Sequence, residues 1–440
     1  MSKTESASKA GSARPFTPQP GRRSFLGGIA LGGAAAIAGA KRARAASRTE
    51  ITFASAKFFG KETVAQVVES YNASQGRVHV TYVELPPPSA STEVHQLLVQ
   101  QLARRNGSPD VFTQDVIWIA EFAGAGWALP LDQEFGADAR KQYFPGVVQA
   151  CTWGGKLTAL PWFIDSGMLY YRTDLLGSTP VPETWDDLVT IAEAAEKAGQ
   201  ARFGFLWQGK QAEVLVCDLV EFVASNGGAI LAPDGKTVLI DDDKSVAAVQ
   251  FMRDTIDRYK ITPQDVLSWD EEPSRRPFTG GQAVFLRNWS YVYTIAQDPK
   301  ASSVVGKVGV APLPHFAGGR SAACLGGYQY GVNASTKNRD AAIDFVGWMS
   351  SPATQLRFAT ALGLAPTRPD VFDEPTLAQS QPFMQKLKPV FLGATPRPVT
   401  PKYAQVTLVL QSSVSRALAE GNVKRALSGA KDRISAIVST

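Results

Sequence analysis

Apolar and polar residues alternate with two different periods at the start of the folded part of the chain. Thr49–Ser55 and Arg77–Glu84 alternate from one residue to the next, as strands do, and Asp110–Thr113 is a short apolar run typical of a buried strand. Between them, Thr63–Tyr71 and Thr92–Arg105 repeat apolar residues every three or four positions, as one face of a helix does. This β-α-β-α-β order predicts a parallel sheet with helical crossover connections.

The same two periods continue towards the end of the chain. Further strands are predicted over Met168–Arg172, Phe203–Trp207, Gly309–Pro312 and Leu325–Asn333. Further helices are predicted over 185–198, 211–226, 245–259 and 340–349, and from Thr407 onwards. No repeat and no low-complexity linker separates the two halves, so we expect an α/β protein whose chain passes between two lobes more than once.

The first 45 residues have the pattern of an export signal. A polar segment ends in Arg22-Arg23, a weakly apolar stretch runs from Phe25 to Ala40, and an A-x-A site follows at Ala43–Ala45. This order resembles a signal peptide of the twin-arginine type and predicts cleavage after residue 45. A basic, disordered N-terminus is the alternative. We expect a soluble periplasmic protein that begins at Ala46, with no cysteine at the cleavage site to carry a lipid.

Removing the signal changes the meaning of the net charge. The whole chain has 45 Lys and Arg against 40 Asp and Glu, but residues 1–45 hold eight of the former and one of the latter. The remaining 395 residues therefore have a net charge of −2, and the basic excess is no argument for a nucleic-acid partner. A length of 395 residues favours two domains over one core.

Cysteines, histidines and motifs narrow the chemistry further. Cys151, Cys217 and Cys324 lie in apolar stretches, which favours buried thiols, although one pair could form a disulfide after export and the sequence does not select which. The three histidines lack the spacing of metal ligands, and the common nucleophile, zinc and nucleotide motifs are absent from the sequence. We therefore predict no metal and no cofactor.

Four loops at predicted strand ends combine an aromatic ring with a carboxylate or an amide. They are Asp115–Trp118, Trp162–Asp165, Trp269–Glu272 and Asn288–Tyr291. A neutral carbohydrate requires this combination, because its C–H face stacks on a ring while its hydroxyls need polar partners. In an open α/β sheet such loops converge at the carboxyl ends of the strands.

Each loop also has a simpler interpretation. Trp118, and likewise Trp127 and Trp153 outside these loops, could belong to the core. Asp115 could cap a helix, Asp165 could be a turn residue, and Glu271 and Glu272 could be a solvated acidic face. A carboxylate pair such as Asp115 and Glu272 could also serve a secreted glycoside hydrolase.

Eight segments, taken together, resemble the sugar-binding group of extracellular solute-binding proteins that serve ABC importers, trehalose- and maltose-binding proteins above all. They occur in the family's order over nearly the whole chain after the signal: 108–132, 160–175, 181–188, 274–293, 326–334, 345–349, 364–368 and 394–399. The resemblance implies two α/β lobes, each a mostly parallel sheet flanked by helices, joined by hinge segments. It assigns 46–160 and 305–363 to the N-terminal lobe, and 161–304 and 364–440 to the C-terminal lobe.

The resemblance also implies roles for individual residues in a cleft between the lobes. Asp115, Asp165 and Glu272 would accept hydrogen bonds from sugar hydroxyls. Trp289 and Tyr291 would be stacking platforms.

Further positions complete the expected binding site. Gly327 would let the backbone approach the sugar, since glycine lacks a Cβ. Arg397 would donate two hydrogen bonds to hydroxyls or to a ring oxygen. Asn226 is a weaker candidate, and Phe58 or Phe59 would stack on the sugar or block part of the site.

The resemblance thus predicts a binding protein and not an enzyme. It would capture a disaccharide such as trehalose or maltose, deliver it to the permease of an ABC importer, and act as a monomer. A polyol, an oligosaccharide or a glycerophosphodiester is the alternative ligand. Of the expected site residues only Arg397 is basic, which favours a neutral sugar over a phosphate-bearing ligand.

Overall fold

The computed structural model describes residues 48–58 and 63–439, and the predicted signal peptide lies outside these ranges. The first sheet has five strands in the order β2-β1-β3-β13-β6. These are β1 (Thr49–Ala56), β2 (Val78–Leu85), β3 (Val111–Asp115), β6 (Leu160–Pro161) and β13 (Tyr328–Val332). β1 is parallel to β2 and β3, whereas β13 is antiparallel to β3 and β6. The predicted β-α-β-α-β beginning is confirmed as the parallel part of this sheet.

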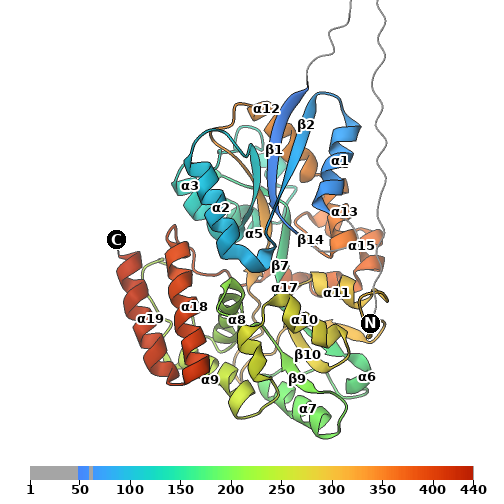
Figure 1. Cartoon of the computed structure of the whole chain (residues 1–440), viewed down its shortest axis with the longest axis vertical. Coiled ribbons are helices and arrows are strands. Elements are labelled where there is room, and N and C mark those ends of the chain that lie inside the picture. The colour runs from blue at the N-terminus through green and yellow to red at the C-terminus, as the bar shows by residue number, and fades with distance from the viewer. Residues whose placement is uncertain (1–47, 59–62, 440) are drawn as a thin grey trace, which may run out of the picture. The chain divides into compact units, whose positions relative to one another are not determined.

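Helices with one apolar face cover the first sheet. α1 (Val64–Ser74) begins with a capping box, in which Thr63 Oγ1 accepts a hydrogen bond from the backbone of Gln66 and the Gln66 side chain accepts one from the backbone of Thr63. The other long helices of this lobe are α2 (Ser91–Ala103), α12 (Arg339–Met349) and α13 (Pro352–Leu362). Figure 1 shows β1 and β2 with these helices around them.

A second sheet has four strands in the order β11-β8-β10-β9. They are β8 (Met168–Arg172), β9 (Phe203–Leu206), β10 (Ala283–Asn288) and β11 (Val308–Ala311). Only β10 and β9 pair in parallel, while β8 is antiparallel to both of its neighbours. The α/β class is as expected, but both sheets are mixed, because strands that arrive through the crossovers enter them antiparallel.

The helices of the second lobe pack on this sheet and on each other. They are α7 (Trp185–Lys197), α8 (Glu213–Ser225), α9 (Asp243–Asp257), α10 (Glu271–Thr279), α18 (Tyr403–Glu420) and α19 (Val423–Val438). α8 is buried on nearly every side, because α9 and α18 pack against it (Figure 1). Its N-terminal end, at Glu213, points towards the crossovers.

A small third sheet, β12-β7-β14, forms where the chain changes sheets. β7 (Phe163–Ser166), β12 (Leu325–Gly326) and β14 (Ala365–Pro366) lie between the two larger sheets (Figure 1). The expected crossings near 161 and 364 fall at β7 and β14. The third expected crossing, near Val308–Ala311, was wrong. The N-terminal lobe was expected to resume at residue 305, but Val308–Ala311 pairs with β8 in the second sheet. The chain therefore returns to the first sheet through β12.

Short elements complete the fold. They are α3 (Ile119–Gly124), α4 (Ala137–Arg140), α5 (Pro145–Ala150), α6 (Thr173–Leu176), α11 (Tyr291–Ala296), α14 (Pro369–Phe372), α15 (Pro375–Ser380), α16 (Pro382–Lys386), α17 (Lys388–Leu392), the hairpin β4 (Thr152–Trp153) and β5 (Lys156–Leu157), and three 3-10 turns, η1 (Pro88–Ala90), η2 (Val116–Trp118) and η3 (Gln264–Ser268). Among residues 48–58 and 63–439, every helix is too short or too polar to cross a membrane.

Candidate binding site

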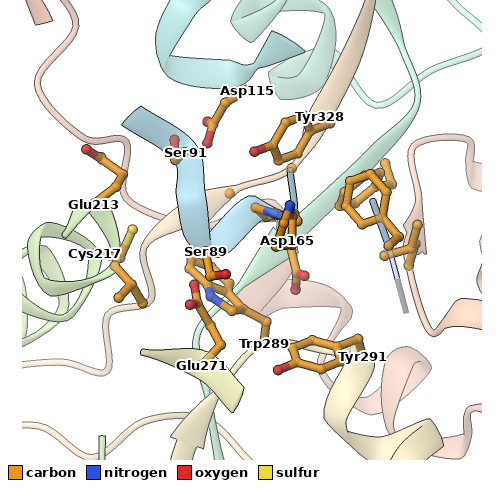
Figure 2. A pocket seen from close by; sticks show the side chains of 18 of the residues that line it. Ser89, Ser91, Asp115, Asp165, Glu213, Cys217, Glu271, Trp289, Tyr291 and Tyr328 are labelled. Atoms are coloured by element: carbon orange, nitrogen blue, oxygen red, sulfur yellow. The ribbon is translucent and has the colours of Figure 1, made fainter. Parts of the chain in front are cut away.

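One cavity collects side chains from both large sheets and from the crossover strands (Figure 2). It encloses about 890 Å³ of space outside atoms, part of it open to solvent, which is in the range of small-molecule sites. Seven of the nine sequence-predicted site residues line it: Asp115, Asp165, Glu272, Trp289, Tyr291, Gly327 and Arg397. Most of them stand at the end of a strand or at the start of a helix, as the alternation of elements predicted.

Asp165 lies on β7 and is held in place by backbone donors. Its Oδ1 accepts hydrogen bonds from the backbone N–H groups of Ser166 (2.8 Å) and Ser290 (3.1 Å). Burial raises the pKa of Asp165 to about 7, although both bonds oppose this rise. Its carboxyl group is therefore oriented in the wall of the cavity and titrates near neutral pH.

Glu272, an expected hydroxyl acceptor, already has strong partners within the protein. It accepts hydrogen bonds from Arg275 Nε (2.9 Å) and Nη2 (2.7 Å), and from the hydroxyl of Tyr291 (2.9 Å). Burial by itself would raise the pKa of Glu272, but Arg275 and Tyr291 outweigh it and lower the pKa. This carboxylate mainly positions Tyr291 at the cavity edge.

The neighbouring residue, Glu271, has the freer carboxyl group. It is the first residue of α10 and is partly buried, and its buried Oε2 has no hydrogen-bond partner in the part of the chain that the structure describes. Burial raises the pKa of Glu271 to about 7, and its interaction with the Trp289 side chain opposes that rise. Figure 2 shows Glu271 and Trp289 side by side in the cavity. The sequence placed Glu271 in the candidate loop Trp269–Glu272 but assigned the acceptor role to Glu272, because adjacent glutamates cannot be ranked before their helix is placed.

Trp289 follows β10 and lies half-buried in the wall. Arg287 covers its ring, with the guanidinium carbon 4.3 Å from the ring centroid. Gly326 lies at its edge, where an added Cβ would come within 2.9 Å of Trp289 Cζ3. The indole is thus fixed between a cation and a glycine, as a rigid stacking platform must be.

Arg397 departs from its expected role. Its Nη2 donates to Asp115 Oδ1 (2.8 Å) and its Nη1 to Glu213 Oε1 (2.9 Å), so neither is free to act as a two-pronged donor to a sugar. Of the three side-chain nitrogen atoms of Arg397, only Nε is buried without a hydrogen-bond partner among the described residues. Burial raises the pKa of Asp115, and Arg397 opposes the rise. Arg397 therefore joins the end of β3 to the start of α8 beside the cavity.

A glycine is required at position 327, but the reason is close packing within the protein and not the approach of a sugar. Its φ of 115° favours glycine, and an added Cβ would lie 2.3 Å from the carbonyl oxygen of Phe163. Its own carbonyl accepts a hydrogen bond from the backbone of Val116 (3.2 Å). This close approach of β7 to the β12–β13 connection shapes the cavity floor.

Of the two remaining expected residues, only Asn226 lies in the part of the chain that the structure describes. Asn226 is a correction: it lies at the opposite end of α8 from Glu213, about 20 Å along the helix, and its side chain donates to the carbonyl of Lys244 (2.8 Å). Phe59 lies outside the described residues. Phe58 lines the cavity, with its ring edge-on to Tyr328 at a centroid distance of 5.5 Å.

Sequence reasoning missed several lining residues. Ser89 and Ser91 follow the proline run at the carboxyl end of β2, a position where strand-end loops gather, so the spacing could have indicated them. Tyr328 lies on β13, and its hydroxyl is buried without a partner among the described residues. Glu213 and Cys217 reach the cavity from one face of α8, and their positions depend on how that helix packs.

Taken together, the cavity offers acidic oxygens and aromatic rings to a small molecule that contacts both lobes. The described residues contain no cluster of His, Cys, Asp and Glu suited to a metal ion. The fold and the cavity therefore define a two-lobe protein with a polar and aromatic cavity of the size of a small-molecule site.

The family follows from comparison with known proteins. The family of bacterial extracellular solute-binding proteins matches residues 55–356, and the chain belongs to it. A probable ABC transporter-binding protein of Deinococcus radiodurans is 36% identical over 362 residues, which cover 79% of this chain and 85% of that protein. The maltose-bound structure of T. maritima MalE3 is 38% identical, covers 88% of this chain and 99% of its own, and has a TM-score of 0.82.

A more distant relative widens the range of ligands found in such proteins. A mannitol-binding protein of Pseudomonas aeruginosa is 24% identical over 293 residues, which cover 65% of this chain and 67% of that protein. These relatives are binding proteins of transporters and not enzymes, which confirms that expectation and removes the glycoside hydrolase. The protein is a solute-binding protein of the kind that serves ABC importers, which bind a small molecule and hand it to a permease.

Proposed function

We propose that the ligand is a disaccharide of the maltose or trehalose type. The observation that carries this proposal is the fixed indole of Trp289 next to the unpartnered Oε2 of Glu271. A pyranose ring presents a C–H face to such an indole and hydroxyls to such an acceptor. Asp165 adds a second acidic acceptor in the same wall.

Similarity supports the same choice of ligand. The solved structure of MalE3 contains bound maltose, and its similarity to this protein covers 88% of the present chain. A polyol is the second candidate, because it would use the same acceptors without needing a ring to stack on, and a mannitol-binding protein is among the relatives.

The proposed mechanism is closure of the two lobes around the ligand. Asp115 and Tyr328 belong to the first sheet, and Glu271 and Trp289 to the second lobe, so one ligand would touch both. A ligand that contacts both lobes stabilises the closed arrangement by its differential affinity. We expect one ligand per monomer and no turnover.

Isothermal titration of protein refolded to remove carried-over ligand tests this proposal. The panel contains maltose, trehalose, sucrose, mannitol and glycerophosphocholine. Saturable binding of maltose or trehalose at one site per chain supports the proposal. Saturation by mannitol alone would favour the polyol, and silence from folded protein would contradict both.

Replacing Trp289 with alanine tests the stacking platform. We expect affinity for the bound disaccharide to fall by about 1–3 kcal/mol, because a buried aromatic contact is lost. Trp348→Phe is the matched control, since Trp348 packs on Tyr71 away from the cavity. Equal affinities for Trp289→Ala and wild type would remove Trp289 from the site.

Export by the twin-arginine route is part of the proposal. Replacing both Arg22 and Arg23 with lysine should leave the uncleaved protein in the cytoplasm, because that route reads the arginine pair. Cell fractionation and immunoblotting measure this, and normal export of the double variant would contradict it.

A further inference from the structure

Two of the three cysteines meet beside the cavity. Cys217 lies on α8 and lines the cavity, and Cys324 immediately precedes β12. Both belong to the core of the second lobe, whereas Cys151 ends α5 and packs in the core of the first. All three are buried free thiols. The sequence left open which pair could form a disulfide.

Backbone contacts hold Cys324 against the face of α8 that carries Cys217. Glu221 stands four residues after Cys217 and therefore shares its helical face. Its Oε1 accepts a hydrogen bond from the backbone N–H of Cys324 (3.1 Å). Arg397, which is bonded to Glu213, donates to the carbonyl of Leu325, so the Cys324–Leu325 segment runs along the face of α8 on which Cys217 lies.

Hydrogen bonds on both sides of Cys324 hold its backbone in place beside α8. The residue after Cys324, Leu325, donates its backbone N–H to Thr395 (2.7 Å) and lies against Arg397 through its carbonyl (3.4 Å). Arg397 is in turn bonded to Glu213, one turn before Cys217 on α8. The backbone on both sides of the two thiols is thus fixed by hydrogen bonds.

We propose that Cys217 and Cys324 are a disulfide-forming pair, oxidised by exchange with a small disulfide such as glutathione disulfide. The Cys217 thiolate attacks one sulfur of the small disulfide and releases one thiolate. The Cys324 thiolate then attacks the Cys217 sulfur and releases the second. Two protein thiols are oxidised, one disulfide is reduced to two thiols, and the two protons pass to the released thiolates.

The position of Cys217 and the compartment in which the family works determine how the disulfide would form. Cys217 is reached through the cavity, and an extracellular family works where disulfides persist. Burial raises the pKa of Cys217, so the reaction is slow at neutral pH and faster under alkaline conditions. The bond would tie α8 to β12, and Gly326 of β12 lines the cavity.

The test uses the wild-type protein, purified under reducing conditions, then incubated at alkaline pH with glutathione disulfide while folded. Thiols are counted after denaturation, and peptides are mapped without reduction. We expect the thiols to fall from three to one, with one cross-linked peptide pair that contains Cys217 and Cys324. The oxidised protein should unfold at a higher temperature, and added dithiothreitol should reverse this.

Variants separate this assignment from its competitors. Cys151→Ser should form the same cross-link at the same rate, and Cys324→Ser should stop at a stable glutathione adduct on Cys217. A cross-link to Cys151 would overturn the proposal. So would three surviving thiols, or a glutathione adduct on wild-type Cys217 that never resolves. None of these readouts depends on the identity of the sugar.

Discussion

Two buried arginines carry the same chemistry in different parts of the molecule. Arg287, on β10, donates two hydrogen bonds to Glu221 and one to Gln208, all within the second lobe. Arg397 donates to Asp115 and Glu213, and so connects the first sheet to α8. One arginine belongs to the interior of a lobe, and the other belongs to the boundary between lobes.

Both arginines are almost completely buried, but the carboxylates that they bind differ in their access to water. Arg287 and Glu221 are almost completely buried, and Asp218, 3.7 Å from Arg287, is buried with them. Burial raises the pKa of Asp218 well above its ordinary value, although Arg287 opposes this. Both partners of Arg397, in contrast, line the cavity. The buried ion pair of Arg287 therefore stabilises the interior of one lobe, whereas the ion pairs of Arg397 hold the two lobes together beside the cavity.

The largest expected effect is on stability, from Arg287→Met. The variant leaves Glu221 buried without its cation, and we expect the free energy of unfolding to fall by about 3–5 kcal/mol. Urea unfolding measured by circular dichroism checks this. Trp289 also loses the cation under its ring, so sugar affinity should fall in whatever protein remains folded.

A surface arginine supplies the control for that loss. Arg258 pairs with Asp254 at 3.7 Å and is 70% exposed, so Arg258→Met should change the free energy of unfolding by less than about 1 kcal/mol. Equal losses for Arg287→Met and Arg258→Met would mean that the buried cluster does not stabilise the second lobe.

Arg397→Met should have a smaller effect on stability. Water from the cavity can solvate Asp115 and Glu213 once the cation is gone, so we expect a loss of about 1–3 kcal/mol. Disaccharide affinity should fall about tenfold or more, which corresponds to about 1.4 kcal/mol, because the lobes lose a shared anchor. Titration calorimetry and urea unfolding of the same preparation give both numbers.

The conservative variant sharpens the contrast. Arg397→Lys keeps a charge but can satisfy only one carboxylate well, and should recover part of the affinity. If Arg397→Met reduced stability as much as Arg287→Met and left affinity unchanged, the two arginines would have the same role.

The sequence predicted the helices and strands better than it predicted how they are divided between the two lobes. Strand and helix periods located α1, α8 and the strands of the two large sheets other than β6 and β10. The position of Val308–Ala311 was wrong, since a short strand shows its period but not its partner. Pairing depends on contacts between residues far apart in the chain, which no local pattern contains.

The candidate site shows the same limit at the level of single residues. Trp289 and Asp165 were assigned to the site by the resemblance of their segments to the family, and both line the cavity. The choice between Glu271 and Glu272 depended on where Arg275 lies, and the role of Arg397 depended on Glu213. The resemblance predicted which residues line the cavity, whereas their partners in the fold decide what each of them does.

A change of pH should affect some of the acidic residues in the cavity wall and not others. Asp165 and Glu271 both have pKa values raised to about 7 by burial, whereas the pKa of Glu272 is lowered. A sugar hydroxyl that donates to Asp165 or Glu271 needs the ionised form, so binding lowers the pKa and releases protons. Affinity should be fully present above pH 7 and should be lost as the pH falls below it, by up to about tenfold per group at pH 6.

Titrations at pH 6, 7 and 8 in two variants assign the effect. Glu271→Gln should flatten the profile in part, because one of the two titrating groups is removed. Glu272→Gln is the matched control and should keep the wild-type slope, since Arg275 and Tyr291 hold Glu272 ionised throughout this range. An affinity that rises as the pH falls would reverse the assignment, because a protonated carboxyl group would then be donating to a sugar oxygen.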